Sequence, residues 1–159
     1  MHPITPCLWF DANAEEAAEF YCSIFPNSRI IHVYRFTETM PDPDGNVLFI
    51  EFELNGQPFQ ALNGGPLFPF TEAVSFVIEC LDQAEVDHYW DILTADGGAP
   101  VQCGWLKDKF GLSWQVVPPG FDTMLRSPDR RRAAQAMRAM MDMVKLDLAQ
   151  LQAAFDADE

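Results

Sequence analysis

The side chains best suited to hold a metal ion or to act as nucleophiles are four cysteines and three histidines. They are Cys7, Cys22, Cys80, Cys103, His2, His32 and His88. No two cysteines form a C-x-x-C pair and no two histidines are four residues apart, so the spacing predicts neither a zinc ribbon nor a thioredoxin-like or helical metal motif. Cys103 is flanked by glycine and polar residues, with lysines nearby, and is either a reactive thiol or, as we favour, a structural cysteine.

A first set of elements is predicted in residues 1–66. The apolar run at 4–10 predicts a strand, and Asn13 with Glu16 fits a capping box at the start of a helix. The helix is expected to end near Phe25, and four of its residues form a stripe with helical spacing: Ala14, Ala17, Ala18 and Tyr21. Strands are predicted at 29–36, 47–54 and 57–62, with a loop at 37–46 and an Asn55-Gly56 hairpin turn.

Residues 67–120 repeat this order of elements. The run at 73–80 predicts a strand, and Asp82, with Glu85 three residues later, predicts the cap of a second helix. Its apolar stripe consists of Val86, Tyr89, Trp90 and Leu93. Gly97-Gly98 ends this helix, and strands are predicted at 100–106 and 112–117. Each module of one helix and a small sheet is too small to close its own core, so we expect the two to lie side by side in one domain, 1–120.

Residues 121–159 predict a C-terminal helical extension. Ser127 is the expected N-cap and Pro128 the first helical residue. The helix carries one apolar stripe, and another follows Asp147. The first consists of Ala134, Met137, Met141 and Val144, and the second of Leu148, Leu151 and Phe155. We expect the extension to pack either on its own domain or on a dimer partner.

Charge separates the body from the extension and excludes some functions. The 159 residues have a net charge of −14, of which residues 1–120 contribute −13, from 4 basic and 17 acidic side chains. Such a surface repels nucleic acid and anionic lipid. The run Arg130-Arg131-Arg132 is predicted to be a solvated helix face or a patch that meets the acidic body.

The repeated module resembles that of the vicinal oxygen chelate superfamily, which includes glyoxalases, dioxygenases and bleomycin-resistance proteins. Within it the chain resembles the PhnB-like family, also called 3-demethylubiquinone 3-methyltransferase-like, and we expect this resemblance to continue into the tail. The segments that carry it are ITPCLWFDANAEEAAEFYCSIFPNSRI, NGQPFQALNGGP and CGWLKDKFGLSWQVVP. The resemblance implies an α+β fold in which two βαβββ modules form a cupped mixed sheet, with its concave side as the active site.

The resemblance also allows the metal site of the superfamily to be tested. Its ligands, usually His and Glu, come from the first and last strand of each module, and the corresponding positions here are Pro6, Gln60, Ser75 and Gln115. These residues offer no carboxylate or imidazole, which divalent ions prefer, so we expect no bound metal. A methyltransferase label would imply S-adenosylmethionine, but no glycine-rich turn follows the first strand, so we expect no cofactor.

What remains is a surface for a small molecule. Gln60 and Gln115 are expected to face one cavity and to hydrogen-bond a small polar or aromatic ligand. Trp9, Phe59, Trp105 and Trp114 either stack on that ligand or belong to the core, Cys103 is a further candidate, and Asn63 is expected to be a turn residue. We favour metal-independent ligand binding, and the alternatives are a lyase, isomerase or dioxygenase with atypical ligands and a dimeric scaffold with a vestigial pocket. The sequence leaves open whether any reaction is catalysed.

The location and the assembly of the protein follow from weaker signals. The first ten residues lack the basic and long apolar regions of a signal peptide, and no apolar run is long enough to span a membrane, so we expect a cytoplasmic protein with reduced thiols. A homodimer is expected because an open sheet has free edges and the extension has an apolar stripe. No nucleic-acid or membrane partner is expected.

Overall fold

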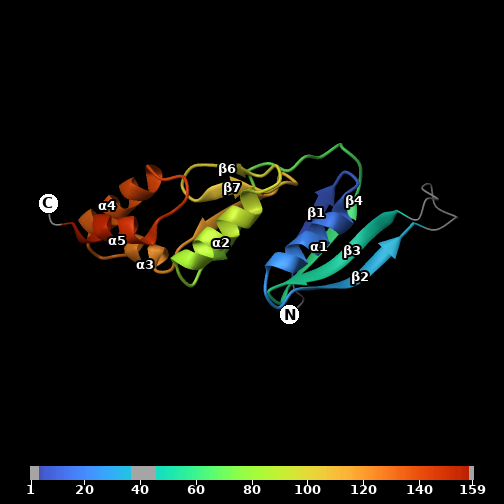
Figure 1. The fold of residues 1–159 in the computed structure, drawn as a ribbon, viewed down its shortest axis with the longest axis horizontal. Coiled ribbons are helices and arrows are strands. Elements are labelled where there is room, and N and C mark those ends of the chain that lie inside the picture. The colour runs from blue at the N-terminus through green and yellow to red at the C-terminus, as the bar shows by residue number, and fades with distance from the viewer. Residues whose placement is uncertain (1–3, 37–45, 158–159) are drawn as a thin grey trace. The chain divides into compact units, whose positions relative to one another are not determined.

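The structure, a computed structural model, describes residues 4–36 and 46–157, so His2 and nearly all of the expected loop at 37–46 lie outside the described residues. The chain divides into a first unit, Met1–Phe70, and a second unit, Thr71–Glu159. The first holds β1–α1–β2–β3–β4, and the second holds β5–α2–β6–β7–β8 followed by the helices α3, α4 and α5 (Figure 1). Two βαβββ modules and an α+β fold are therefore confirmed.

The sheet of the first unit is mixed and has the strand order β1-β4-β3-β2. Its strands are β1 (Cys7–Phe10), β2 (Arg29–Arg35), β3 (Val47–Leu54) and β4 (Gln57–Asn63). β1 pairs with β4 in parallel, and the other pairs are antiparallel. Asn55 and Gly56 both have positive φ, 48° and 78°, which confirms the predicted Asn-Gly hairpin because a type I′ turn requires φ above zero at both positions.

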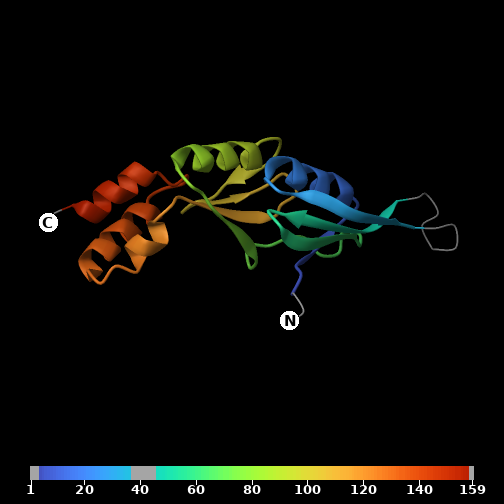
Figure 2. The same cartoon turned by 90° about the horizontal axis from the view of Figure 1, so that it is seen from below.

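Helix α1 (Ala14–Ile24) covers one face of this sheet and buries the predicted stripe from Ala14 to Tyr21 (Figure 2). Its cap differs from the prediction, because the Asn13 side chain makes no capping hydrogen bond. Asn63 takes that role instead: its Oδ1 accepts from the Ala14 amide at 2.9 Å while its Nδ2 donates to the Val47 carbonyl at 2.9 Å. Asn63, at the end of β4, therefore fixes the start of α1 to the sheet.

The second unit repeats the topology with shorter strands, in the order β5-β8-β7-β6. Its elements are β5 (Ser75–Glu79), α2 (Gln83–Thr94), β6 (Ala99–Pro100), β7 (Trp105–Lys107) and β8 (Ser113–Val117). The Asp82 side chain accepts from the Glu85 amide at 2.9 Å, so the predicted cap of α2 is confirmed. The single strand predicted at 100–106 is wrong: β6 and β7 are separate, and Cys103 and Gly104 between them have positive φ.

The extension contains three helices, α3 (Phe121–Leu125), α4 (Arg130–Met141) and α5 (Leu148–Asp156). The predicted start of the helix at Pro128 is wrong, because Asp129 is the N-cap of α4 and accepts from the amides of Arg131 and Arg132. Ser127 lies before the N-cap, and its hydroxyl oxygen accepts a hydrogen bond from the Asp129 amide at 3.2 Å. The hydrogen bonds that the Asp129 carboxylate accepts from the backbone amides of Arg132 and Arg131 lower its pKa.

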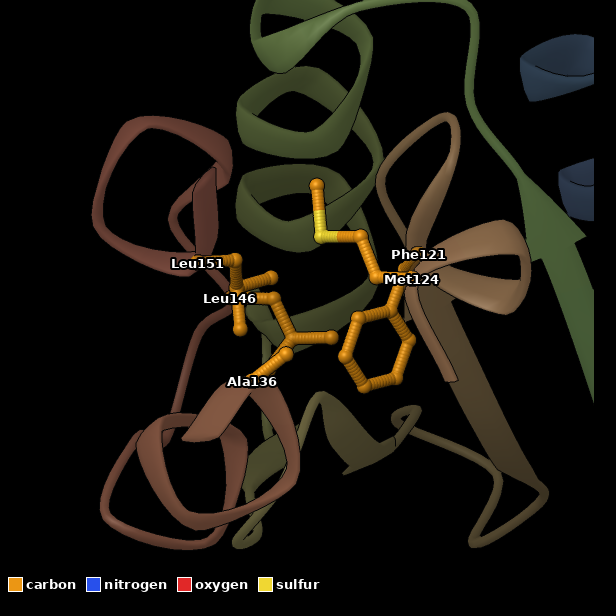
Figure 3. Close-up of a cluster of buried hydrophobic side chains, with 5 residues drawn as sticks. All are labelled: Phe121, Met124, Ala136, Leu146 and Leu151. Carbon is orange, nitrogen blue, oxygen red and sulfur yellow. The ribbon is translucent and has the colours of Figure 1, made fainter. Parts of the chain in front are cut away.

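The core of the extension is a cluster of five buried side chains, Phe121, Met124, Ala136, Leu146 and Leu151 (Figure 3). They come from all three helices and from the segment before α5, and Leu148 and Phe155 pack against them. The stripe predicted on the first helix is wrong by one position: Ala133 and Ala136 are buried, whereas Met137 and Met141 are 39% and 61% exposed. No helix among the described residues is long and apolar enough to cross a membrane.

Candidate functional site

Cross-strand register shows which side chains share a face of the first sheet. Ile50 pairs with Ala61 and Phe52 with Phe59, and these four residues are buried on the face that α1 covers. Phe59 is 7% exposed and stacks on Phe52 with ring centroids 5.6 Å apart, so it belongs to the core. Since side chains alternate along a strand, Gln60 and Trp9 point to the opposite face, which we call the open face.

The open face of the first sheet carries two neighbouring rows of residues. The register places Trp9, Leu62, Phe49 and Tyr34 in one row across the four strands. The next row consists of Cys7, Gln60, Glu51 and His32. Ring contacts join the rows, because Tyr34 lies 4.2 Å from the His32 ring and 5.6 Å from the Phe49 ring. An apolar row thus lies beside a polar one.

A groove of about 410 Å³ opens on the first unit. It is lined by Tyr34, Leu48, Phe49, Leu62 and Asn63. Sequence reasoning selected Gln60 and Trp9 but missed four of the five groove residues, although the alternating pattern of 47–54 already separates Phe49 and Glu51 from the buried side chains. The fifth, Asn63, was expected to be a turn residue, and that prediction is wrong because Asn63 is the last residue of β4. The sequence does not reveal the register of β2 with β3, which brings Tyr34 next to Phe49.

Trp9 is held at the border of the open face by a close backbone approach. Its indole Nε1 donates to the Gly65 carbonyl at 2.9 Å, and its ring meets Phe68 edge to face at 5.0 Å. A Cβ on Gly64 would lie 2.2 Å from the Trp9 ring, so only glycine fits at that position. The indole is therefore fixed in place before any ligand arrives.

The open face of the second sheet has a different polar arrangement. Gln115 pairs in register with Val77 and Trp105, and its Nε2 donates to the Ser75 hydroxyl at 2.9 Å. Lys107, two register positions further along the ladder, forms an ion pair with Glu72, and this contact lowers the pKa of the Glu72 carboxyl. Here Gln115 and Lys107 are each paired with a neighbouring polar side chain, whereas the buried Ser113 hydroxyl has no hydrogen-bond partner among the described residues.

Trp114 and Cys103, two further predicted residues, have structural positions. Trp114 is 3% exposed and shares the buried face with Leu106 and Val116. Its Nε1 donates to the buried Asp108 carboxylate at 2.8 Å. The backbone amide of Cys103 donates to the Met143 carbonyl at 2.8 Å, which joins the β6–β7 turn to the extension.

The residues at the superfamily's metal positions do not fit a divalent metal ion. Pro6 has no side-chain ligand, and its carbonyl accepts from the Gln60 amide at 2.9 Å. Gln115 and Ser75 are hydrogen-bonded to each other and offer only neutral oxygens. Within residues 4–36 and 46–157, no three His, Cys, Asp or Glu side chains gather in a group that could hold a metal.

The family described as 3-demethylubiquinone-9 3-methyltransferase matches residues 2–117. The chain belongs to this family. The PhnB protein of Bacillus cereus is 35% identical, with a TM-score of 0.68 over 74% of this chain and 99% of that one. Because the family match ends at Val117, the resemblance that we expected to continue into the tail stops before the extension.

More distant solved structures share the fold. A protein of Pseudomonas aeruginosa is 20% identical, with a TM-score of 0.61 over 74% of this chain and 98% of that one. The fosfomycin resistance protein FosX of Listeria monocytogenes is 17% identical, with a TM-score of 0.57 over 79% of this chain and 98% of that one. The vicinal oxygen chelate fold predicted from the sequence is thereby confirmed. A search of curated proteins finds no match.

The methyltransferase in the family's description implies S-adenosylmethionine, and the start of α1 does not fit that cofactor. A Rossmann-type site needs a glycine-rich turn between the first strand and its helix, so that the backbone amides can meet the ligand. Here the turn is Asp11-Ala12-Asn13, and the Ala14 amide that begins α1 is already bonded to Asn63. The sheet of the first unit is also mixed: of its three described strand pairs, one is parallel and two are antiparallel.

Proposed function

We propose that this protein binds a small organic molecule with an aromatic part on the open faces of its sheets, without a resident divalent metal. The observation that carries the proposal is the groove of the first unit, where an apolar row beside Phe49 adjoins a polar row beside Gln60. Ligand sites typically combine an apolar lining with a few polar groups that orient the ligand. Trp9 at the border of this face supplies a preorganised aromatic surface.

The open face of the second sheet offers proposed contacts of its own, Gln115 and Trp105. Gln115 uses its amide nitrogen on Ser75, so its carbonyl oxygen is the atom left to face a ligand. We do not include Phe59 and Trp114 among the ligand contacts, because they belong to the core. Cys103 is left out as well, because its backbone amide binds the Met143 carbonyl of the extension. Metal independence is supported by the neutral side chains at Gln60, Ser75 and Gln115.

The test combines metal analysis with ligand binding. Protein purified without chelator is expected to hold far less than one zinc, iron, nickel or manganese ion per chain after dialysis. A screen of small aromatic compounds should raise the melting temperature equally with and without EDTA, because a ligand that binds only the folded state stabilises it by mass action. One tightly held metal ion per chain would favour the metal-dependent enzyme instead. If no compound raises the melting temperature, the alternative of a dimeric scaffold with a vestigial pocket is favoured.

We further propose that the protein is a homodimer that uses the extension. Met137 and Met141, one turn apart on α4, are 39% and 61% exposed, and the extension is nearly neutral while residues 1–120 carry −13. A second copy can therefore cover this surface with little repulsion. Light scattering should give about twice 18.0 kDa, and the double substitution Met137→Glu, Met141→Glu should give a folded monomer. A wild-type monomer at high micromolar concentration would contradict the proposal.

A further inference from the structure

Glu51 places a carboxylate beside the groove, and no cation in residues 4–36 or 46–157 pairs with it. The residue is half-buried on β3, and among the described residues its hydrogen-bond partner is the Tyr34 hydroxyl, which donates to Oε2 at 3.4 Å. A hydrogen bond of that length is weak, and a charged acceptor ordinarily makes shorter ones. Oε1 has no partner within the described residues. Tyr34 also lines the groove, so the carboxylate and the apolar lining belong to one surface.

The arginines of the first unit are already used elsewhere. Residues 1–70 contain two arginines, no lysine and nine acidic side chains. Arg29 pairs with Glu53 at 3.1 Å, and Arg35 pairs with Glu15. Glu53 and Glu51 are two positions apart on the same strand, yet only Glu53 is neutralised. The first unit therefore presents a carboxylate next to aromatic rings in an acidic field.

We propose that the ligand of the first sheet is a planar aromatic molecule that carries a positively charged nitrogen. This inference rests on the proposed function and adds the chemical class of the ligand. The aromatic part lies in the groove against Tyr34 and Phe49, and the cationic nitrogen donates to Glu51. The Gln60 side chain, which is in register with Glu51, offers a neutral donor and acceptor beside the charge.

Three physical effects favour the binding of a cation over an anion at this surface. A charged N–H donor to a carboxylate makes a shorter and stronger hydrogen bond than a neutral pair. The Tyr34 ring is 44% exposed, and its face attracts a cation. An anion would instead face Glu51 with no arginine available to offset the repulsion, and the net charge of the molecule adds to that penalty.

The experiment compares two probes of similar size and opposite charge. Calorimetric titration at 0.15 M salt measures 1-naphthylmethylammonium and 1-naphthylacetate against the full chain, because this salt concentration screens charges beyond about 8 Å. We expect the cation to bind at least about tenfold more tightly than the anion. Glu51→Gln keeps the shape and removes the charge, and it should reduce this preference to within about twofold.

Glu53→Gln is the matched control, because it changes the net charge by the same amount on the same strand. It should keep the tenfold preference, since Arg29 already neutralises Glu53. Equal binding of the two probes, a preference that survives Glu51→Gln, or an equal loss in both variants would overturn the cationic ligand class while leaving ligand binding intact. If neither probe binds the wild-type protein, the proposed function fails together with this inference. The melting temperature of each variant confirms that it is folded.

Discussion

The two sheets share one topology but use their polar side chains differently. On the first sheet, Gln60 forms no side-chain hydrogen bond among the described residues, and Glu51 has one long contact. On the second sheet, Gln115 is bonded to Ser75, Lys107 to Glu72, and the buried Asp108 to Trp114. Of the two glutamines at equivalent positions, Gln60 has no side-chain hydrogen bond among the described residues, whereas Gln115 is bonded to Ser75.

The extension adds to this difference through its contacts within the second unit. The Gly104 amide donates to the Val144 carbonyl at 2.8 Å, and a Cβ on Gly104 would lie 2.8 Å from Leu146. The Gln83 amide group, at the start of α2, bonds the Leu146 carbonyl and the Leu148 amide. We call residues 142–147 the latch; they make all of these contacts except that of the Leu148 amide, which begins α5. In the second unit, therefore, polar groups are used for contacts that stabilise the fold.

The largest expected effect is at Asp108. Asp108→Ala leaves the Trp114 indole N–H and the amides of Phe110 and Leu112 without their acceptor, and these bonds are 2.8, 2.9 and 3.0 Å long. Each buried donor left unpaired costs about 1–3 kcal/mol, so the loss should be roughly 3 kcal/mol or more. Thermal denaturation should show a decrease of roughly 6–12 °C for a chain of this size.

Glu51→Ala, on the first sheet, is the substitution whose effect on stability is compared with that of Asp108→Ala. It removes a half-buried carboxylate with one weak contact, so its free energy of unfolding should change by no more than about 0.5 kcal/mol. If both substitutions destabilise the protein equally, the contrast between an available and a committed polar set is wrong.

The second prediction concerns the latch. Gln83→Ala removes two hydrogen bonds to the latch and to the start of α5, and a partly buried amide and carbonyl lose their partner. We expect a loss of about 1–2 kcal/mol, localised in the extension. Hydrogen exchange should speed up in residues 142–157 and remain unchanged in the first unit. Gln152→Ala, which loses only a bond to Asp156 within α5, should leave the latch amides protected.

The sequence was sufficient for the elements whose signals are local. The stripes of α1 and α2, the Asn55-Gly56 turn and the Asp82 cap were all predicted correctly, because hydrophobic period and turn chemistry depend on neighbouring residues. It failed where a distant residue decides the outcome. Asn63 replaces Asn13 as the cap of α1 from 49 positions away, and α4 buries Ala136 rather than Met137 because α3 and α5 pack there.

The candidate site shows the same division between local and distant information. Gln60 and Trp9 were identified from the resemblance and from residue type. Glu51, Tyr34 and the groove depend on the register of β2 with β3, which includes irregular positions between Ile30 and His32 and cannot be read from periodicity. Phe59 and Trp114 were equally good candidates by type, and only the face that each strand presents to its helix distinguishes them from Trp9.

The third prediction compares the two glutamines at equivalent positions. Gln115→Ala breaks the bond to the Ser75 hydroxyl and should cost about 1 kcal/mol in the free energy of unfolding. Gln60→Ala breaks no side-chain hydrogen bond among the described residues and should cost less than about 0.5 kcal/mol. Urea denaturation of the two variants measures the difference. A larger cost for Gln60→Ala would reverse the assignment of the two sheets.

The smallest expected effect is the pH dependence of the latch. The hydrogen bond from Lys145, at 2.7 Å, and then that from Gln83 lower the pKa of the Asp87 carboxyl. A depressed pKa in the folded state means that this contact stabilises the protein fully above the unfolded-state pKa of about 3.9 and is lost as the pH falls through the lower, folded-state value. Hydrogen exchange in the latch, corrected for the intrinsic rate, should therefore be constant from about pH 6 to 8.

Asp87→Asn separates this contact from general acid unfolding. At pH 7 the variant lacks the ion pair with Lys145, so its latch amides should exchange somewhat faster than those of the wild type. As the pH falls through the lowered folded-state pKa, the wild-type carboxyl is protonated as well, so the two proteins should converge. Because both groups are partly exposed, at 46% and 38%, the difference should be small and should shrink further at high salt. A gap that stays constant as the pH falls would show that Asp87 holds the latch by shape rather than by charge.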